Sequence, residues 1–268
     1  MAKIQLNGKK ITINSKSSIQ DLLKNFSDDQ KKQLSKSQFL SSTDTSAAFK
    51  YSLEYNPSGS SNIKLRFPNL CLDTQVSLFL KYNAENYISA IALIAEQISL
   101  DEFEIVRSNS IKLPQGRGEI LKLREGNILI DFAHDHQSIQ NILSELANYH
   151  DEIILVFGFG GDRDNSKRSK MMKVAQDFAS KIFFTSDNNR YEPFSSIVKD
   201  AMAGNSYTSI EILEDRKEAI NLALQCLNKE NILVILGKGH ETYMDVSGKK
   251  VPFNDRDCVL EILGNEIN

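Results

Sequence analysis

The spacing of hydrophobic and polar residues changes near residue 110. After residue 118, short runs of aliphatic and aromatic residues alternate with runs whose apolar positions recur at helical spacing. The short runs are predicted to be strands: Ile128–Phe132, Ile153–Phe157, Lys181–Ser186, Ile210–Leu213 and Ile232–Leu236. The amphipathic runs between them are predicted to be helices: Ser138–Asn148, Ser169–Ala179, Pro193–Met202 and Arg216–Leu227. Such alternation predicts an α/β fold, in which a Rossmann-like parallel sheet is flanked by helices.

The preceding residues show a weaker and less regular pattern. Strands are predicted at Lys10–Asn14 and Ala48–Glu54, helices at Ser17–Asn25 and Asn83–Ile98, a hairpin turn at Asn7-Gly8, loops over the rest of 41–62, and a linker at Arg107–Gly118. We therefore expect a smaller, partial α/β region over residues 1–110 and a second domain over residues 111–268.

Composition narrows the class of protein. The 268 residues are 41% hydrophobic and 25% charged, as in ordinary globular proteins. The net charge of -3 shows no basic footprint of the kind that nucleic-acid binding needs. The N-terminus lacks the apolar segment of a signal peptide, and no apolar run approaches the roughly 20 residues that span a bilayer. We expect a cytoplasmic protein that binds neither nucleic acid nor membrane.

Charged or glycine-rich loops follow four of the predicted strands. Their sequences are AHDHQS after Phe132, GFGGDRDNSKR after Phe157, DNNRYEP after Ser186 and GKGHETY after Leu236. In parallel α/β sheets, ligands bind outside the carboxyl ends of the strands. The four loops therefore predict a functional cleft at one edge of the sheet.

The residue types in these loops suit a ligand that has both carboxylate and ammonium groups, such as an amino acid. Arg190 presents a planar fork that matches a carboxylate, and Glu241 is suited to hold an ammonium. Each loop has a simpler interpretation when it is taken alone. DNNR is a common turn sequence, and GFGG differs from a dinucleotide-binding G-x-G-x-x-G because Asp162 and Arg163 follow the glycines directly. The alternative interpretation, a nicotinamide-dependent oxidoreductase, would be supported by GFGG alone.

Taken together, the motifs resemble one family. They are GRGE (Gly116–Glu119), DFAH (Asp131–His134), FGFGGDRD with a following KR (Phe157–Arg168), TSDNNRYE (Thr185–Glu192), ILEDRKEAI (Ile212–Ile220), GKGHETY (Gly237–Tyr243) and PFNDR (Pro252–Arg256). Their order and spacing resemble the C-terminal domain of the MurE type of Mur ligase. KYNAENYISAIAL (Lys81–Leu93) is similar to the helix that ends the family's central domain.

The resemblance implies a fold, a reaction and site residues. Such ligases use ATP and Mg²⁺ to phosphorylate a carboxylate, which the amine of an incoming amino acid then attacks. By motif, Arg117 and Asp131 resemble residues that contact the ATP ribose, and His134 resembles the catalytic histidine beside the phosphates. The residues that resemble the amino-acid pocket are Arg163, Asp187, Asn188, Arg190, Gly237 and Glu241. No metal ligand is predicted in this chain.

The implied function is addition of a diamino acid to UDP-MurNAc-dipeptide in peptidoglycan precursor synthesis. Arg190 favours meso-diaminopimelate over lysine, although the family turn Asp-Asn-Pro-Arg has Asn189 in place of its proline, which we expect to loosen the turn. The family's N-terminal domain and its P-loop have no counterpart here, since LNGKKIT (Leu6–Thr12) lacks the upstream glycine. We expect the chain alone not to activate a carboxylate. Three explanations remain open: a fragment, half of a split ligase completed by a second polypeptide, or a ligase-derived binding or regulatory protein.

Overall fold

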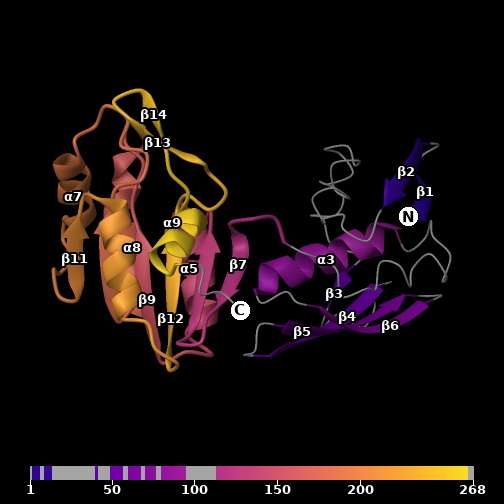
Figure 1. Cartoon of the computed structure of the whole chain (residues 1–268). Helices are drawn as coiled ribbons and strands as arrows, with labels where there is room; N and C mark the ends of the chain where they lie inside the picture. Colours follow the sequence, from indigo (N-terminus) through magenta and orange to yellow (C-terminus); the bar gives the residue numbers. More distant parts are fainter. Residues whose placement is uncertain are drawn as a thin grey trace. The chain divides into compact units, whose positions relative to one another are not determined.

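The computed structural model describes residues 2–6, 9–13, 40–41, 49–56, 60–67, 70–76, 80–94 and 113–264. The chain divides into two compact units, Met1–Pro114 and Gln115–Asn268 (Figure 1). Among the described residues, no helix has both the length and the apolar character that crossing a membrane requires.

Among its described residues, the first unit contains a two-stranded antiparallel sheet, a four-stranded mixed sheet and one helix. Strands β1 (Ala2–Leu6) and β2 (Lys9–Ile13) pair so that Leu6 lies opposite Lys9. The predicted Asn7-Gly8 turn lies outside the described residues. A second sheet has the order β3-β4-β5-β6, from Leu40–Ser41, Phe49–Asn56, Ser60–Phe67 and Leu70–Val76. Helix α3 (Lys81–Ile94) packs on β4 and β5.

The predictions for this unit are partly confirmed. The two predicted strands and the long helix are present, with bounds shifted by a few residues. The prediction that residues 41–62 form loops, apart from one strand, was wrong, because β5 begins at Ser60. β5 pairs with β4 on one side and β6 on the other, and such pairing overrides the weak strand preference of serine and asparagine. The predicted helix at Ser17–Asn25 lies outside the described residues.

The second unit is built on a six-stranded sheet of order β11-β10-β9-β12-β8-β7. The strands are β7 (Arg117–Lys122), β8 (Asn127–Asp131), β9 (Glu152–Phe157), β10 (Lys181–Thr185), β11 (Ile210–Leu213) and β12 (Asn231–Leu236). All neighbouring pairs are parallel except β7 with β8. The predicted parallel α/β sheet with flanking helices is therefore confirmed, and all five predicted strands are present.

Helices cover this sheet because its central strands are apolar on both faces. The helices are α5 (His136–Leu146), a 3₁₀ turn (Asn165–Lys167), α6 (Arg168–Phe178), α7 (Phe194–Met202), α8 (Arg216–Gln225) and α9 (Asp255–Ile262). Alternate strand residues such as Ile130, Val156 and Ile235 pack with Ala219 of α8 and Val259 of α9. Helix α5 lies beside α6, and α6 lies beside α7.

The sequence missed elements at both ends of this unit. The predicted linker at Arg107–Gly118 was wrong at its end, since β7 starts at Arg117, with a bulge before Glu119. A hairpin of β13 (Tyr243–Val246) and β14 (Lys249–Pro252) and helix α9 were also not predicted. These segments are short or lie at a sheet edge, so their periodicity is too brief to stand out.

Candidate functional site

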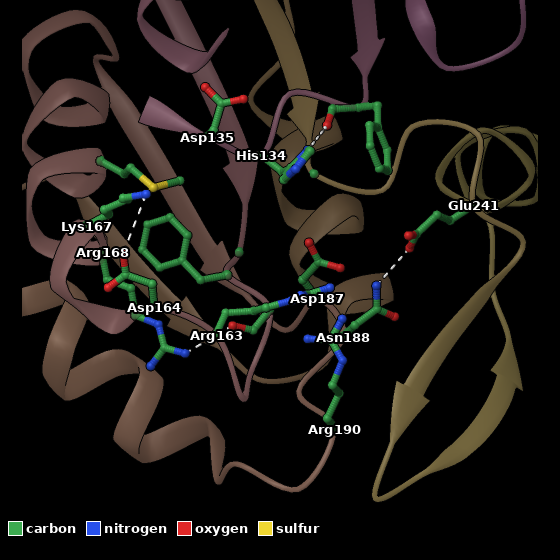
Figure 2. A pocket seen from close by; sticks show the side chains of 16 residues that line it. His134, Asp135, Arg163, Asp164, Lys167, Arg168, Asp187, Asn188, Arg190 and Glu241 are labelled. Carbon is green, nitrogen blue, oxygen red and sulfur yellow. Dashed lines mark hydrogen bonds and ion pairs between the residues drawn. The ribbon is translucent and has the colours of Figure 1, made fainter. Parts of the chain in front are cut away.

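The four charged loops meet around a cavity of about 440 Å³ at the carboxyl ends of β8, β9, β10 and β12 (Figure 2). The cavity is lined by Phe132, His134, Asp135, Gly158, Phe159, Gly160, Arg163, Asp164, Lys167, Arg168, Met171, Asp187, Asn188, Arg190, Gly237 and Glu241. The six residues predicted for amino-acid binding and His134 are all among them. Arg117 and Asp131 are not; they lie opposite each other where β7 pairs with β8.

A hydrogen-bonded network forms one part of the cavity wall. The amide Nδ2 of Asn188 donates to Oε2 of Glu241 at 2.8 Å, which Figure 2 shows as a dashed line. The Nζ of Lys238 donates to the same Oε2 at 2.9 Å. Burial alone would raise the pKa of Glu241, but the hydrogen bonds from Lys238 and Asn188, with the charge of Lys238, outweigh it and lower the pKa. Glu241 is therefore held as a carboxylate that faces the cavity.

Asp187 is a buried carboxyl at the same wall. Its Oδ1 has no hydrogen-bond partner in the described structure, and the Nζ of Lys238 lies 3.8 Å from it. Burial raises the pKa of Asp187, and the charges of Arg216 and Lys238 oppose that shift. A buried oxygen without a partner is unfavourable. The unpaired oxygen is itself buried, although Asp187 lines the cavity.

Two arginines supply positive charge. Arg190 has a backbone φ of 50° and donates from Nη1 to the carbonyl of Gly161. Its backbone N–H donates to the carbonyl of Asp245 at 2.9 Å, which ties the turn to β13. Arg163 is exposed and lines the cavity (Figure 2). A Cβ on Gly160 would lie 3.9 Å from the Cγ of Arg163 and 3.3 Å from the Nη1 of Arg190, so both arginines approach this glycine. The two guanidinium groups are suited to a carboxylate.

The glycine-rich loop after β9 fits closely against the turn after β10. A Cβ on Gly158 would lie 2.1 Å from the carbonyl oxygen of Thr185, and one on Gly161 would lie 2.0 Å from that of Asn189. The Nδ2 of Asn189 donates to Oγ of Ser186 at 3.0 Å. In place of the family's proline, this turn therefore has a buried side-chain hydrogen bond.

Arg168, which sequence reasoning did not select, fixes the far end of this loop. Its guanidinium binds Glu192 through both nitrogens, Asp200 at 3.0 Å and the carbonyl of Gly160 at 3.0 Å. Hydrogen bonding to Glu192 raises the pKa of Arg168 and lowers that of Glu192. Because Arg168 is saturated by these partners, it acts as an anchor although it lines the cavity.

Rings and cations gather where β8 ends. The Cζ of Arg117 lies 4.3 Å from the centre of the Phe132 ring, and the rings of His134 and His240 lie 4.8 and 4.9 Å from it. The Nδ1 of His134 lies 3.0 Å from the carbonyl oxygen of Phe132, so Nε2 points elsewhere. The buried Asp131 accepts the N–H of Ala133 at 2.8 Å.

A fully buried ion pair lies behind the loops after β10 and β12. Arg216 of α8 binds Asp255 of α9 at 2.7 and 2.9 Å, and both side chains are 0% exposed. Arg216 also donates to the carbonyls of Ser186 and Leu236, the residues before Asp187 and Gly237. Both partners belong to motifs quoted above, ILEDR and PFNDR, but periodicity gave no sign that they pair.

In the part of the chain that the structure describes, no group of three or more His, Cys, Asp or Glu side chains is arranged to hold a metal ion.

Comparison with known proteins agrees with this geometry. The family model described as "Mur ligase, glutamate ligase domain" matches residues 116–239. The UDP-N-acetylmuramoyl-L-alanyl-D-glutamate–2,6-diaminopimelate ligase of Caldanaerobacter subterraneus is 38% identical over 190 residues, which are 69% of this chain and 39% of the relative. The ligase of the same name from Helicobacter hepaticus is 44% identical over 135 residues, covering 49% of this chain and 28% of the relative.

Comparison with solved structures shows that the fold is similar to that of known ligases. A 2,6-diaminopimelate ligase of that name superposes with a TM-score of 0.63 at 29% identity, over 84% of this chain and 47% of its own. A folylpolyglutamate synthase from Thermotoga maritima has a TM-score of 0.54 at 19% identity, over 71% of this chain and 44% of its own, and shows the fold alone.

Through residues 116–239, the chain belongs to the Mur ligase family. Within that family it is similar to the 2,6-diaminopimelate ligases, the MurE type. The chain spans about two fifths of the length of the curated relatives it matches.

Proposed function

We propose that this chain supplies the amino-acid-binding part of a ligase that adds meso-diaminopimelate, in preference to lysine, to UDP-N-acetylmuramoyl-dipeptide. The observation that carries the proposal is the distribution of charge around the cavity. Arg163 and Arg190 face it with guanidinium groups, whereas Asp187 and Glu241 face it with carboxyl groups. An amino acid has a carboxylate for the first pair and an ammonium for the second.

The distal end of the ligand distinguishes diaminopimelate from lysine. Both have an ammonium there, but only diaminopimelate also has a carboxylate. A cavity with two arginines as well as two acids suits the second carboxylate, and the relatives are named as 2,6-diaminopimelate ligases. In this proposal Asn188 and Gly237 complete the pocket, and residues 111–268 form the C-terminal domain of the ligase. Residues 1–110 correspond to a divergent, partial central-domain-like region, and the protein acts in the cytoplasm.

ATP is the expected cosubstrate because Mur ligases are ATP-dependent. Asp131 offers a carboxylate for ribose hydroxyls, and Arg117, stacked on Phe132, offers a guanidinium beside it. His134 is exposed at the cavity and offers Nε2 toward a phosphate. The residue types fit a nucleotide, which would supply the phosphoryl group that activates a carboxylate. We assign these residues to binding and derive no phosphoryl-transfer step, since the sequence contains no P-loop motif.

Titration calorimetry of the full chain with meso-diaminopimelate and with L-lysine tests the proposal. We expect saturable binding of diaminopimelate that is at least about tenfold tighter than that of lysine, because one charged hydrogen-bonding contact is worth about 1.5–3 kcal/mol. Arg190→Ala should abolish this preference. Arg124→Ala, an exposed arginine in the turn before β8, is the matched control and should leave it unchanged. Binding of neither amino acid by the folded chain would refute the proposal.

A further inference from the structure

Lys238 is a lysine that is 0% exposed and lies behind the cavity wall. Its Nζ donates to Oε2 of Glu241 at 2.9 Å and to the carbonyl of Tyr243 at 2.7 Å. It also lies 3.4 Å from Oδ1 of Asn188 and 3.8 Å from Oδ1 of Asp187. Burying an ammonium is unfavourable unless it is paired. All its side-chain partners are residues that line the cavity.

The contacts of Lys238 decide which way the Asn188 amide points. An ammonium and a backbone N–H can only donate, and both Lys238 and the N–H of Asp245 (2.9 Å) reach the same atom of Asn188. That atom must therefore be the oxygen. The Nδ2 group therefore faces Glu241. The two donors fix the orientation of the amide, which would otherwise have two alternatives.

The same contacts divide the two oxygens of Glu241 between the interior and the cavity. Oε2 accepts both Lys238 and Asn188. Oε1 has no hydrogen bond among the described residues, and Glu241 lines the cavity, so Oε1 is the oxygen left for a ligand. The flanking glycines fix the path of the loop. Gly237 and Gly239 have φ values of 110° and 48°, which disfavour other residues.

We infer that Lys238 is a positioning residue of the amino-acid site, which orients Asn188 and presents one oxygen of Glu241 to the ammonium of the incoming amino acid. The inference rests on the proposed function. Lys238 itself does not touch the ligand, so its effect on binding should pass through Glu241.

A double-mutant cycle in the full chain tests this by calorimetry with meso-diaminopimelate. Lys238→Met should weaken binding at least about tenfold, and so should Glu241→Gln. The double variant should bind no more weakly than Glu241→Gln alone, because the two residues act as one unit. Independent, multiplying losses would overturn the inference. Lys217→Met is the matched control: it removes an exposed lysine paired with Glu261 and should leave the affinity unchanged.

Circular dichroism and thermal melting verify folding of each variant. If Lys238→Met does not fold, Lys238→Gln, which keeps a hydrogen-bond donor without the charge, replaces it in the cycle. If neither folds, Lys238 is a residue of the fold and the inference is wrong. A wild-type chain that binds diaminopimelate, with a Lys238 variant that binds it equally well, refutes only the inference. A folded wild-type chain without binding refutes the proposed function, and the inference with it.

Discussion

Two walls of the cavity are anchored in different ways. The β9 wall (Gly158–Arg168) is fixed by Arg168, whose partners Glu192 and Asp200 have side chains that are 18% and 33% exposed. The β10–β12 wall (Asp187–Arg190 with Gly237–Glu241) is backed by Arg216 and Asp255, both 0% exposed. Arg168 is buried but its carboxylate partners are partly exposed, whereas both members of the second pair lie inside the core.

This difference in the exposure of the ion pairs determines what destabilises each wall. Removing one partner of a buried pair leaves an uncompensated charge in the interior. A partly exposed pair is screened, and it can be weakened by protonating its carboxylate. We therefore expect substitution of a partner in the buried pair to destabilise the β10–β12 wall. We expect low pH to destabilise the β9 wall.

The largest expected effect is that of Asp255→Ala. It strands the Arg216 guanidinium in the core and should lower the free energy of unfolding by about 3–5 kcal/mol. Urea denaturation measures this. Glu261→Ala breaks the exposed pair with Lys217 and should lower the free energy of unfolding much less. Equal losses in the two variants would show that burial of the Arg216–Asp255 pair does not raise the cost of losing a partner.

Gly239→Ala should cause the second-largest loss of stability. The residue has φ of 48°, and a Cβ would lie 2.5 Å from the carbonyl oxygen of Gly116 and 2.7 Å from the backbone nitrogen of Phe132. Left-handed strain of about 1–2 kcal/mol adds to an overpacking penalty of about 1–3 kcal/mol. Gly204→Ala, at φ of 76° with nothing within 4 Å, should show the strain alone. A smaller loss in Gly239→Ala than in Gly204→Ala, by urea denaturation, would contradict the close packing.

Glu192→Gln tests the pH response of the β9 wall. The pKa of Glu192 is lowered by its hydrogen bond with Arg168, so its stabilisation is complete above the unfolded-state pKa of about 4.3 and is lost as pH falls through the lower folded-state pKa. The variant should be about 2 kcal/mol less stable than wild type at pH 7. This difference should narrow below about pH 4.

Urea midpoints measured at a series of pH values from 7 to about 3 follow that difference. Glu211→Gln, in the more exposed pair with Lys181, is the control and should change stability little at any pH. A difference between wild type and Glu192→Gln that stays constant with pH would show that Glu192 does not act through its charge.

The smallest expected effect belongs to Asp135, which lines the cavity but is part of neither wall. Its carboxylate caps α5 by accepting the N–H of Ser138 at 2.9 Å, and this bond lowers the pKa of Asp135. Asp135→Ala should lower stability by about 1 kcal/mol. Diaminopimelate affinity should stay unchanged. A loss of affinity would give Asp135 a role in binding that its capping geometry does not explain.

Local periodicity predicted the elements that position the site. The runs that became β8, β9, β10 and β12 are apolar and strand-length, and the loops that follow them carry the candidate residues. Because parallel strands share an edge, the sequence also indicated that these loops meet. It did not indicate that Arg117 and Asp131 lie outside the lining of the cavity. That depends on the antiparallel edge strand β7, which has too brief a pattern to predict.

By itself, the sequence determined the parallel α/β architecture and the residue types available at its ligand-binding edge, because hydrophobic spacing and glycine content act over a few residues. Only the tertiary structure decided which of those side chains are anchors and which face the cavity. Arg168 and Arg190 both look like free cations in the sequence, but Glu192 and Asp200 saturate the first. Arg216 and Asp255 are 39 residues apart and meet only because α8 and α9 pack on the same face of the sheet.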